Sequence, residues 1–113
     1  MKNISLPVNS YWYYMIEHGL SFDYRQVKPY WIRRFTTCKA DAGIDEIKSN
    51  LLGYDTATFY LSRRKDPKFP PITLPIRAIS VREGGELGFP KGWYFIIELD
   101  RRDGKRTEIE SIS

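Results

Sequence analysis

The chain has 113 residues, of which 42% are hydrophobic and 15% aromatic, and its net charge at pH 7 is +4. This length predicts one domain, residues 1–113, with enough apolar material to form a core. No run approaches the ~18 apolar residues of a membrane-spanning helix, and residues 1–8 lack the basic segment and apolar core of a secretory signal, so we expect a cytoplasmic protein without a membrane partner.

The charges are distributed unevenly. Basic residues concentrate in residues 25–39, 63–68 and 101–106, whereas residues 41–48 are acidic. This asymmetry predicts one basic face, which favours nucleic acid or another polyanion as the partner.

One cysteine, Cys38, and one histidine, His18, limit the metal and redox chemistry. A single cysteine allows no internal disulfide, which fits a reducing compartment. A structural zinc site needs four nitrogen or sulfur ligands. We therefore predict no metal site and no cofactor, with Cys38 as a small filler residue and His18 as a surface or capping residue.

The chain begins with a predicted strand over residues 2–8, because apolar side chains alternate there and Pro7 then ends the strand. Asn9 and Ser10 offer N-cap side chains to a helix over residues 11–18. Gly19 stands where a left-handed C-cap is expected. Helical spacing predicts that Trp12, Met15 and Ile16 face the core, with Tyr13 and Glu17 pointing elsewhere.

Residues 21–27 alternate again and predict a second strand. Phe22, Tyr24 and Gln26 fall on one face, and Asp23, Arg25 and Val27 on the other. Pro29 suits the first position of a helix that runs to about Thr36. Its apolar stripe is Trp31, Ile32 and Phe35, while Tyr30, Arg33 and Arg34 lie on the opposite side, offered to solvent or a ligand.

The second half of the chain predicts mainly strands. A short helix over residues 45–52 is closed by Gly53, and residues 56–62 form a strand with Ala57, Phe59 and Leu61 on one face. A basic turn follows at residues 63–68.

The alternation from Ile72 to Ala78 slips by one residue at Ile79 and Val81, which is what a β-bulge produces. Pro75 places this half of the strand at a sheet edge or beside the bulge. After a loop over residues 83–90, residues 93–100 predict the strongest strand, and the Asp103-Gly104 turn predicts that residues 105–112 pair back onto it. The expected fold is α+β: a small, mostly antiparallel barrel or curled sheet of five to six strands with two or three short helices packed on it.

The stretch from Asp23-Tyr24-Arg25 to Pro29-Tyr30-Trp31 resembles the ASCH domains of the PUA-like superfamily, especially the small ones of phages and mobile elements. Those domains read strand, helix, glycine, an acidic-Tyr-Arg triplet and then a Pro-Tyr-Trp helix opening. The Gly53-Tyr54-Asp55-Thr56 segment is also similar. The resemblance covers residues 2–82 by order of elements, plus the closing strand at residues 93–99, with residues 23–35 as its specific part. It implies a PUA-like β-barrel with a cleft between the barrel and the helices.

The resemblance implies nucleic-acid binding, with RNA or a single strand as the expected partner. The expected binding residues, on a basic and aromatic cleft, are Tyr24, Arg25, Lys28, Tyr30, Trp31, Arg33, Arg34, Arg63 and Arg64. For Arg25 a salt bridge with Asp23 is the competing interpretation, for Trp31 a core position, and for Arg33 and Arg34 a merely solvated face.

Two alternatives stay open. The first is an amidohydrolase- or ribonuclease-like enzyme, with Ser21, Asp23, Glu83 and Glu86 as the candidate groups. One ASCH branch hydrolyses acetylated cytidine with a lysine, a threonine and a glutamate, but this sequence has no lysine between Gly19 and Asp23. The second is a phage protein-interaction module that blocks a host factor. The oligomeric state is left open by the sequence.

Overall fold

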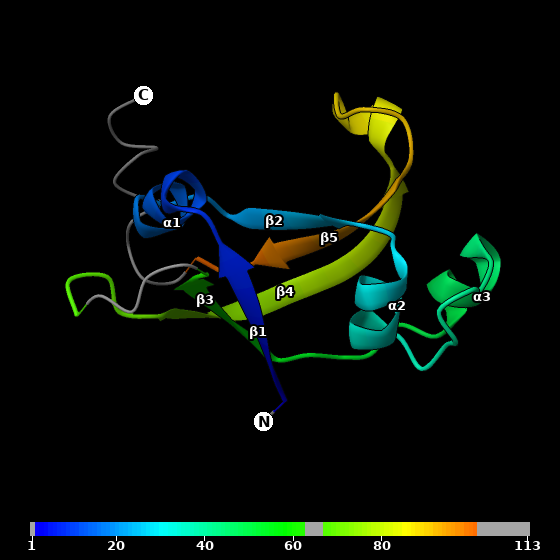
Figure 1. The fold of residues 1–113 in the computed structure, drawn as a ribbon, viewed down its shortest axis with the longest axis horizontal. Helices are drawn as coiled ribbons and strands as arrows, with labels where there is room; N and C mark the ends of the chain where they lie inside the picture. Colours follow the sequence, from blue (N-terminus) through cyan, green and yellow to red (C-terminus); the bar gives the residue numbers. More distant parts are fainter. Residues whose placement is uncertain (1, 63–66, 102–113) are drawn as a thin grey trace. The chain divides into compact units, whose positions relative to one another are not determined.

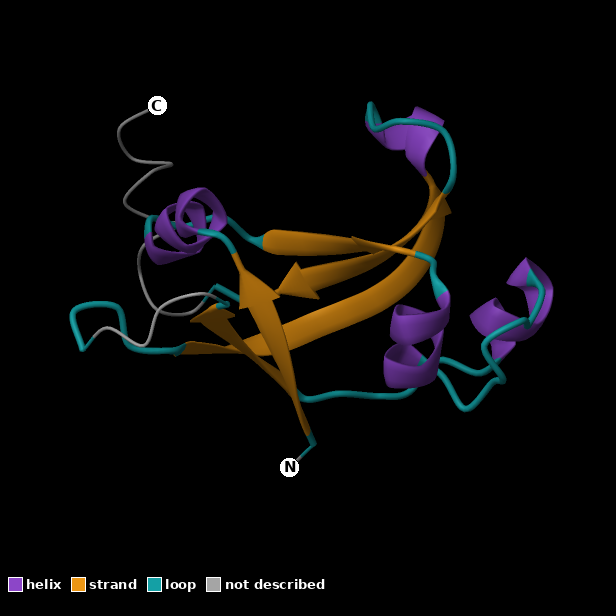
Figure 2. Cartoon of the chain, viewed as in Figure 1, coloured by secondary structure: helices purple, strands orange, loops and turns teal. Residues whose placement is uncertain are grey.

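The structure is a computed structural model that describes residues 2–62 and 67–101 (Figure 1). These residues form an α+β fold of five strands, three α-helices and a short 3-10 helix (Figure 2). In chain order the elements are β1 (Asn3–Val8), α1 (Ser10–Glu17), β2 (Phe22–Gln26), α2 (Pro29–Phe35), α3 (Ile44–Ser49), β3 (Thr56–Leu61), β4 (Ile72–Glu83), η1 (Gly84–Leu87) and β5 (Trp93–Leu99). The predicted strand over residues 105–112 lies outside the described residues.

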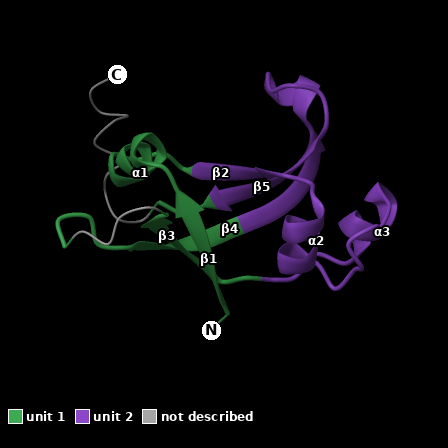
Figure 3. Cartoon of the chain, viewed as in Figure 1, with its two compact units in different colours: residues 1–21, 54–77, 99–113 green, residues 22–53, 78–98 purple. Residues whose placement is uncertain are grey.

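The described residues divide into two compact units (Figure 3). Unit 1 comprises residues 2–21, 54–62, 67–77 and 99–101. Unit 2 comprises residues 22–53 and 78–98. Unit 1 therefore holds β1, α1 and β3, and unit 2 holds β2, α2, α3 and β5, while the residues of β4 are divided between them.

The five strands form a mixed sheet, which corrects the expectation of a mostly antiparallel one. In unit 1, β1 pairs with β3 in parallel, with Asn3 opposite Thr56, and β3 pairs with β4 antiparallel. In unit 2, β2 pairs with β5 antiparallel, with Phe22 opposite Glu98. Alternation of side chains reports which face is buried but not strand direction, and the long connection from β1 to β3 permits a parallel pair.

The core of unit 1 is built from the inward faces of two parallel strands. Ile4 and Leu6 of β1 and Ala57 and Phe59 of β3 are all 0–1% exposed, as their alternation predicts. β1 continues through Pro7 instead of ending there. Among the described strands β1 has β3 as its one neighbour, so the missing N–H of Pro7 interrupts no second ladder.

Helix α1 buries a different face from the predicted one. Tyr13 and Ile16 are buried, whereas Trp12 and Met15 are half-buried. The reason is a distant partner: the Tyr13 hydroxyl donates a hydrogen bond to the carbonyl oxygen of Pro70 at 2.7 Å, which allows the ring to be buried without an unpaired polar group.

Both ends of α1 are capped by contacts that the sequence signals in part. Asn9 is the N-cap, and its Oδ1 accepts from the Trp12 N–H at 2.7 Å. Gly19 has φ 111°, the left-handed conformation expected after a helix end. Arg101 is buried, and its Nη1 donates to the carbonyl oxygens of Ile16 and Leu20 at 3.0 and 3.2 Å, which satisfies acceptors that the end of the helix leaves open.

The core of unit 2 lies between α2, α3 and β5. Ile32 and Phe35 of α2 and Ile47 of α3 are buried, and Phe35 stacks on Phe95 of β5 with ring centroids 4.8 Å apart. β5 is buried almost continuously, which explains why it gave the strongest strand pattern. α3 begins at Ile44 and ends at Ser49, earlier than the predicted helix over residues 45–52.

The predicted slip in β4 is present in its burial pattern. Leu74 is buried and Ile76 half-buried, Arg77 and Ala78 are both exposed, and the buried phase resumes with Val81. Ala78 is therefore not on the inward face where the alternation had placed it. Pro75 does not lie at a sheet edge, because it stands opposite Thr56 of β3 and its carbonyl oxygen accepts from the Asp100 N–H at 2.9 Å.

Candidate nucleic-acid interface

Helix α2 presents its polar face as the sequence predicts. Pro29 lies in the first turn, where a proline suits the helix start, and the buried side chains of Ile32 and Phe35 fix the helix against unit 2. Tyr30 and Arg33 then point outward; Tyr30 is 52% exposed and Arg33 is exposed. Lys28, directly before the helix, is also exposed. We name Lys28, Tyr30, Arg33 and Arg34 the α2 surface.

Arg34 is held against two rings instead of extending into solvent. Its Nη1 donates to the Tyr30 hydroxyl at 2.8 Å. Its guanidinium carbon lies 5.7 Å from the Tyr30 ring centroid and 6.0 Å from that of Trp31, within the range of cation–π attraction. The i, i+4 spacing of Tyr30 and Arg34 makes this contact possible on one helix face.

Asp23 and Arg25 form the salt bridge that the sequence left as an alternative. Nε and Nη2 of Arg25 donate to Oδ2 of Asp23 at 2.9 and 2.8 Å, and the two side chains are 13% and 4% exposed. The Arg25 guanidinium also lies 4.9 Å from the Trp31 ring centroid. The Asp23 carboxylate is thus engaged by a neighbouring cation, and this arrangement is that of a structural pair.

Trp31 is neither fully buried nor openly presented. It is half-buried, its ring meets Tyr30 at 4.8 Å in an edge-to-face contact, and it lies 5.8 Å from Phe35. The guanidinium groups of Arg25 and Arg34 also lie close to the Trp31 ring. Trp31 therefore contacts two residues of the α2 surface, Tyr30 and Arg34. Tyr30 is the more accessible ring of the two.

Tyr24 is separated from this cluster. It alternates with Arg25 along β2, so the two side chains leave opposite faces of the strand. The Tyr24 ring stacks on Phe89 at 4.4 Å and meets Tyr94 edge to face at 5.8 Å. Arg63 and Arg64 lie outside the described residues.

One contact of unit 2 was missed by sequence reasoning. The Lys48 ammonium lies 4.6 Å from the Trp93 ring centroid, which joins the last turn of α3 to the start of β5. No local sequence pattern predicts this contact, because the two residues are distant in the sequence.

The other candidate catalytic groups differ in exposure. Glu83 is half-buried and Glu86 is exposed in η1, and Ser21 is half-buried in unit 1. Within residues 2–62 and 67–101, no three side chains of His, Cys, Asp or Glu come together as a metal site would need. None of the helices in the same residues is long and apolar enough to span a membrane.

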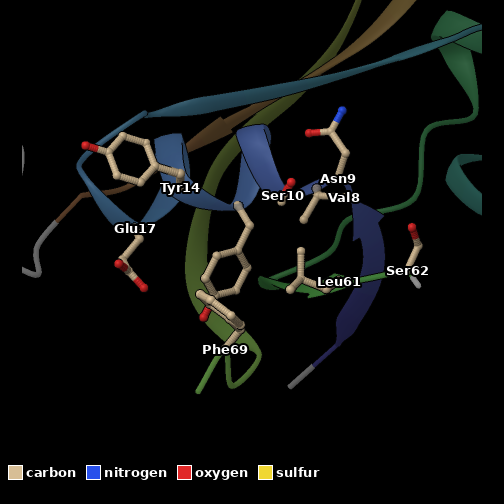
Figure 4. Close-up of a pocket in the computed structure, with 9 residues that line it drawn as sticks. Val8, Asn9, Ser10, Tyr14, Glu17, Leu61, Ser62 and Phe69 are labelled. Carbon is tan, nitrogen blue, oxygen red and sulfur yellow. The ribbon is translucent and has the colours of Figure 1, made fainter. Parts of the chain in front are cut away.

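Unit 1 contains a pocket of about 650 Å³ (Figure 4). Its walls come from the end of β1, from α1, from the end of β3 and from Phe69. Burial and the nearby Glu17 carboxylate raise the pKa of the Tyr13 hydroxyl in this wall above its ordinary value of 10.0. This pocket was not predicted from the sequence, because its lining combines residues between Val8 and Glu17 with Leu61, Ser62 and Phe69, which are distant in the chain.

Comparisons of the chain with protein-family models, with curated proteins and with solved structures found no match.

Proposed function

We propose that this chain is a nucleic-acid-binding module that takes single-stranded RNA on the α2 surface. The observation that carries the proposal is the position of Arg34, whose guanidinium group lies against the rings of Tyr30 and Trp31 while 52% of Tyr30 stays exposed. A cation fixed beside an accessible ring suits a nucleotide, because the ring stacks on the base and the cation attracts the phosphate.

The electrostatics of the α2 surface support the same partner. Lys28 and Arg33 are exposed, and among the described residues no carboxylate forms a salt bridge with either of them. The Asp23–Arg25 salt bridge joins two side chains that are only 4% and 13% exposed. Lys28, Arg33 and Arg34 therefore form a positive patch that phosphates can approach, and binding to such a patch weakens as salt is added.

An exposed tyrosine favours a single strand over a duplex. A base can stack on Tyr30 only where it is unstacked from its neighbours, which is the normal condition in single strands, loops and bulges. The choice of RNA over DNA rests on the family resemblance, and a comparison of matched oligonucleotides tests it separately.

The family we propose is that of the ASCH domains in the PUA-like superfamily. The support is the order of β1, α1, Gly19, the Asp23-Tyr24-Arg25 triplet and the Pro29-Tyr30-Trp31 helix start. The Asp23–Arg25 pair offers a structural role for the acidic-Tyr-Arg triplet. Asp23 binds the guanidinium group of Arg25, and that group also lies against Trp31 of the following helix.

The test is a salt titration of binding to a labelled single-stranded RNA, with a DNA of the same sequence alongside. For Arg33→Ala/Arg34→Ala we expect weaker binding and a slope of log K against log salt that is shallower by about 1.4, since each lost phosphate contact on a single strand removes about 0.7. The matched control is Arg82→Ala/Lys91→Ala, which removes the same charge from two exposed residues of unit 2 outside the α2 surface.

The proposal is overturned if the control pair changes the slope as much as the test pair, because binding would then follow net charge alone. It is also overturned if no oligonucleotide binds at low salt. Capture of an acidic protein in a salt-sensitive complex would then favour the protein-interaction function, and turnover of a modified nucleoside would favour an enzyme.

A further inference from the structure

The pocket of unit 1 differs in chemistry from the rest of this basic chain. Among the described residues that line it, Glu17 is the one charged side chain, and no described lysine or arginine lines it. Glu17 is half-buried, and it forms no salt bridge with any residue in the described part of the chain. A carboxylate that is partly removed from water without a cationic partner attracts a cation more strongly than an exposed one does.

Two exposed aromatic rings line the same pocket. Phe69 is 40% exposed and Tyr14 is 57% exposed, although both are large rings. The His18 ring packs against the Tyr14 ring at a tilt of 31°, with centroids 4.0 Å apart. The faces of such rings carry negative electrostatic potential and attract organic cations.

The Phe69 ring is held in a fixed orientation. It meets the Tyr13 ring at 89°, with centroids 5.8 Å apart, and Tyr13 is 3% exposed and anchored through its hydroxyl to Pro70 at 2.7 Å. Glu17 lies one helical turn beyond Tyr13 on α1, and all three side chains line the pocket (Figure 4). A ring and a carboxylate that are positioned before binding lower the cost of ordering a ligand.

We propose that this pocket binds an organic ammonium ion, a methylated or quaternary amine, with its cationic head against Phe69, Tyr14 and Glu17. The volume of about 650 Å³ lies in the range of small-molecule sites and leaves room for a polar tail beside Asn9, Ser10 and Ser62. Among the described lining residues one carboxylate is too few ligands for a metal ion, and an anion would be repelled by Glu17. The inference is independent of the proposed function, since it concerns other residues and a ligand of opposite charge.

The test compares choline with 3,3-dimethylbutan-1-ol, its neutral isostere, by titration of the full chain in NMR or calorimetry. We expect choline to bind more tightly than the isostere by roughly five- to tenfold, because shape and apolar area are the same and the charge differs. Glu17→Gln and Phe69→Leu should each weaken choline binding by a similar factor and leave binding of the isostere unchanged within about twofold.

Two matched variants serve as controls. Glu46→Gln removes the charge of an exposed glutamate on α3 of unit 2. Tyr60→Leu replaces an exposed aromatic ring of β3, which does not line the pocket, by an aliphatic side chain. Both should bind choline like the unmodified chain, and thermal unfolding reports whether each variant is folded.

Three outcomes would overturn the proposal. The first is equal binding of choline and its isostere, the second is a Glu17→Gln variant that binds choline as tightly as Glu46→Gln does, and the third is no saturable choline binding at millimolar concentrations. RNA binding by the Glu17 and Phe69 variants should be unchanged. If the pocket does not bind choline, the proposal that the α2 surface binds RNA is therefore not affected.

Discussion

On the α2 surface the Arg34 guanidinium lies against the rings of Tyr30 and Trp31, whereas in the pocket of unit 1 aromatic rings and the Glu17 carboxylate line one cavity. In the first case the cation that an aromatic ring attracts is supplied by the chain itself, and the surface that results is positive. In the second case no described lysine or arginine lines the pocket, and we propose that its rings attract an external cation. The two proposed ligands therefore differ in charge because the charged group next to the rings differs.

The largest expected effect separates a ring of the core from a ring of the pocket. Phe35 is 0% exposed and stacks on Phe95, so Phe35→Ala should lower the free energy of unfolding by about 3–5 kcal/mol, through lost burial and the cavity left behind. The matched change Phe69→Ala, at a ring that is 40% exposed, should cost about 1 kcal/mol or less. Urea denaturation followed by fluorescence measures both, and equal losses would contradict this division of roles.

The next effect tests whether the Asp23–Arg25 pair is structural. Asp23→Asn should lower the free energy of unfolding by about 1.5–3 kcal/mol, the usual worth of a hydrogen bond to a charged partner, because Asp23 is 3% exposed. Asp45→Asn, at an exposed position of α3, should change it by about 0.5 kcal/mol or less. An Asp23→Asn chain that stays as stable as the Asp45 control but loses a hydrolytic activity would instead identify Asp23 as a catalytic residue.

Tyr30→Ala tests whether one aromatic ring of the α2 surface stacks on a base. The variant should weaken RNA binding by about 1–3 kcal/mol, the range for one base stacked on an aromatic ring, with little change in the salt dependence. Tyr11→Ala, which removes a 66% exposed tyrosine from α1 of unit 1, should leave RNA affinity unchanged. Fluorescence anisotropy at fixed salt measures both affinities, and equal losses would argue against a specific stacking position.

The smallest effect is a pH dependence confined to the pocket. The pKa of Tyr13 is raised by burial and by Glu17, so the folded state holds the hydroxyl proton more tightly than the unfolded state does. This contribution to stability is fully present below about pH 10 and is lost as the pH rises through the folded-state pKa. Tyr13→Phe should therefore lose less stability than the unmodified chain between pH 9 and pH 11, the interval that brackets the ordinary tyrosine value of about 10. Denaturation curves across that interval measure the difference, and parallel losses would contradict it.

Local signals predicted the elements whose burial is simple. β1 and β5 follow their apolar patterns, α1 begins at the Asn9 cap, and α2 begins at Pro29. The buried face of α1 was predicted wrongly because residues 11–14 are all aromatic, so periodicity alone does not select a face. The selection comes from the Pro70 carbonyl oxygen, which accepts the Tyr13 hydroxyl from 57 positions away in the chain.

The site was predictable to the same extent. The outward position of Tyr30 and Arg33 follows from helical spacing, and the Asp23–Arg25 pair from alternation along one strand. The contact of Arg25 with Trp31, the separation of Tyr24 toward Phe89, and the pocket all depend on segments that meet only in the folded chain. Strand direction has the same origin, since a parallel pair is decided by the connection and not by either strand.

The parallel pairing of β1 with β3 has a consequence during synthesis. β1 can pair with β3 only after Thr56, the partner of Asn3, has been synthesised. In the same way, the pocket can form only after the interval between the synthesis of Glu17 and that of Phe69. At the usual elongation rates of 5–20 residues per second, that interval lasts roughly 3–10 s. During this time β1 lacks its partner strand and the Tyr13 hydroxyl lacks its acceptor, so the apolar side chains of nascent unit 1 stay exposed to water.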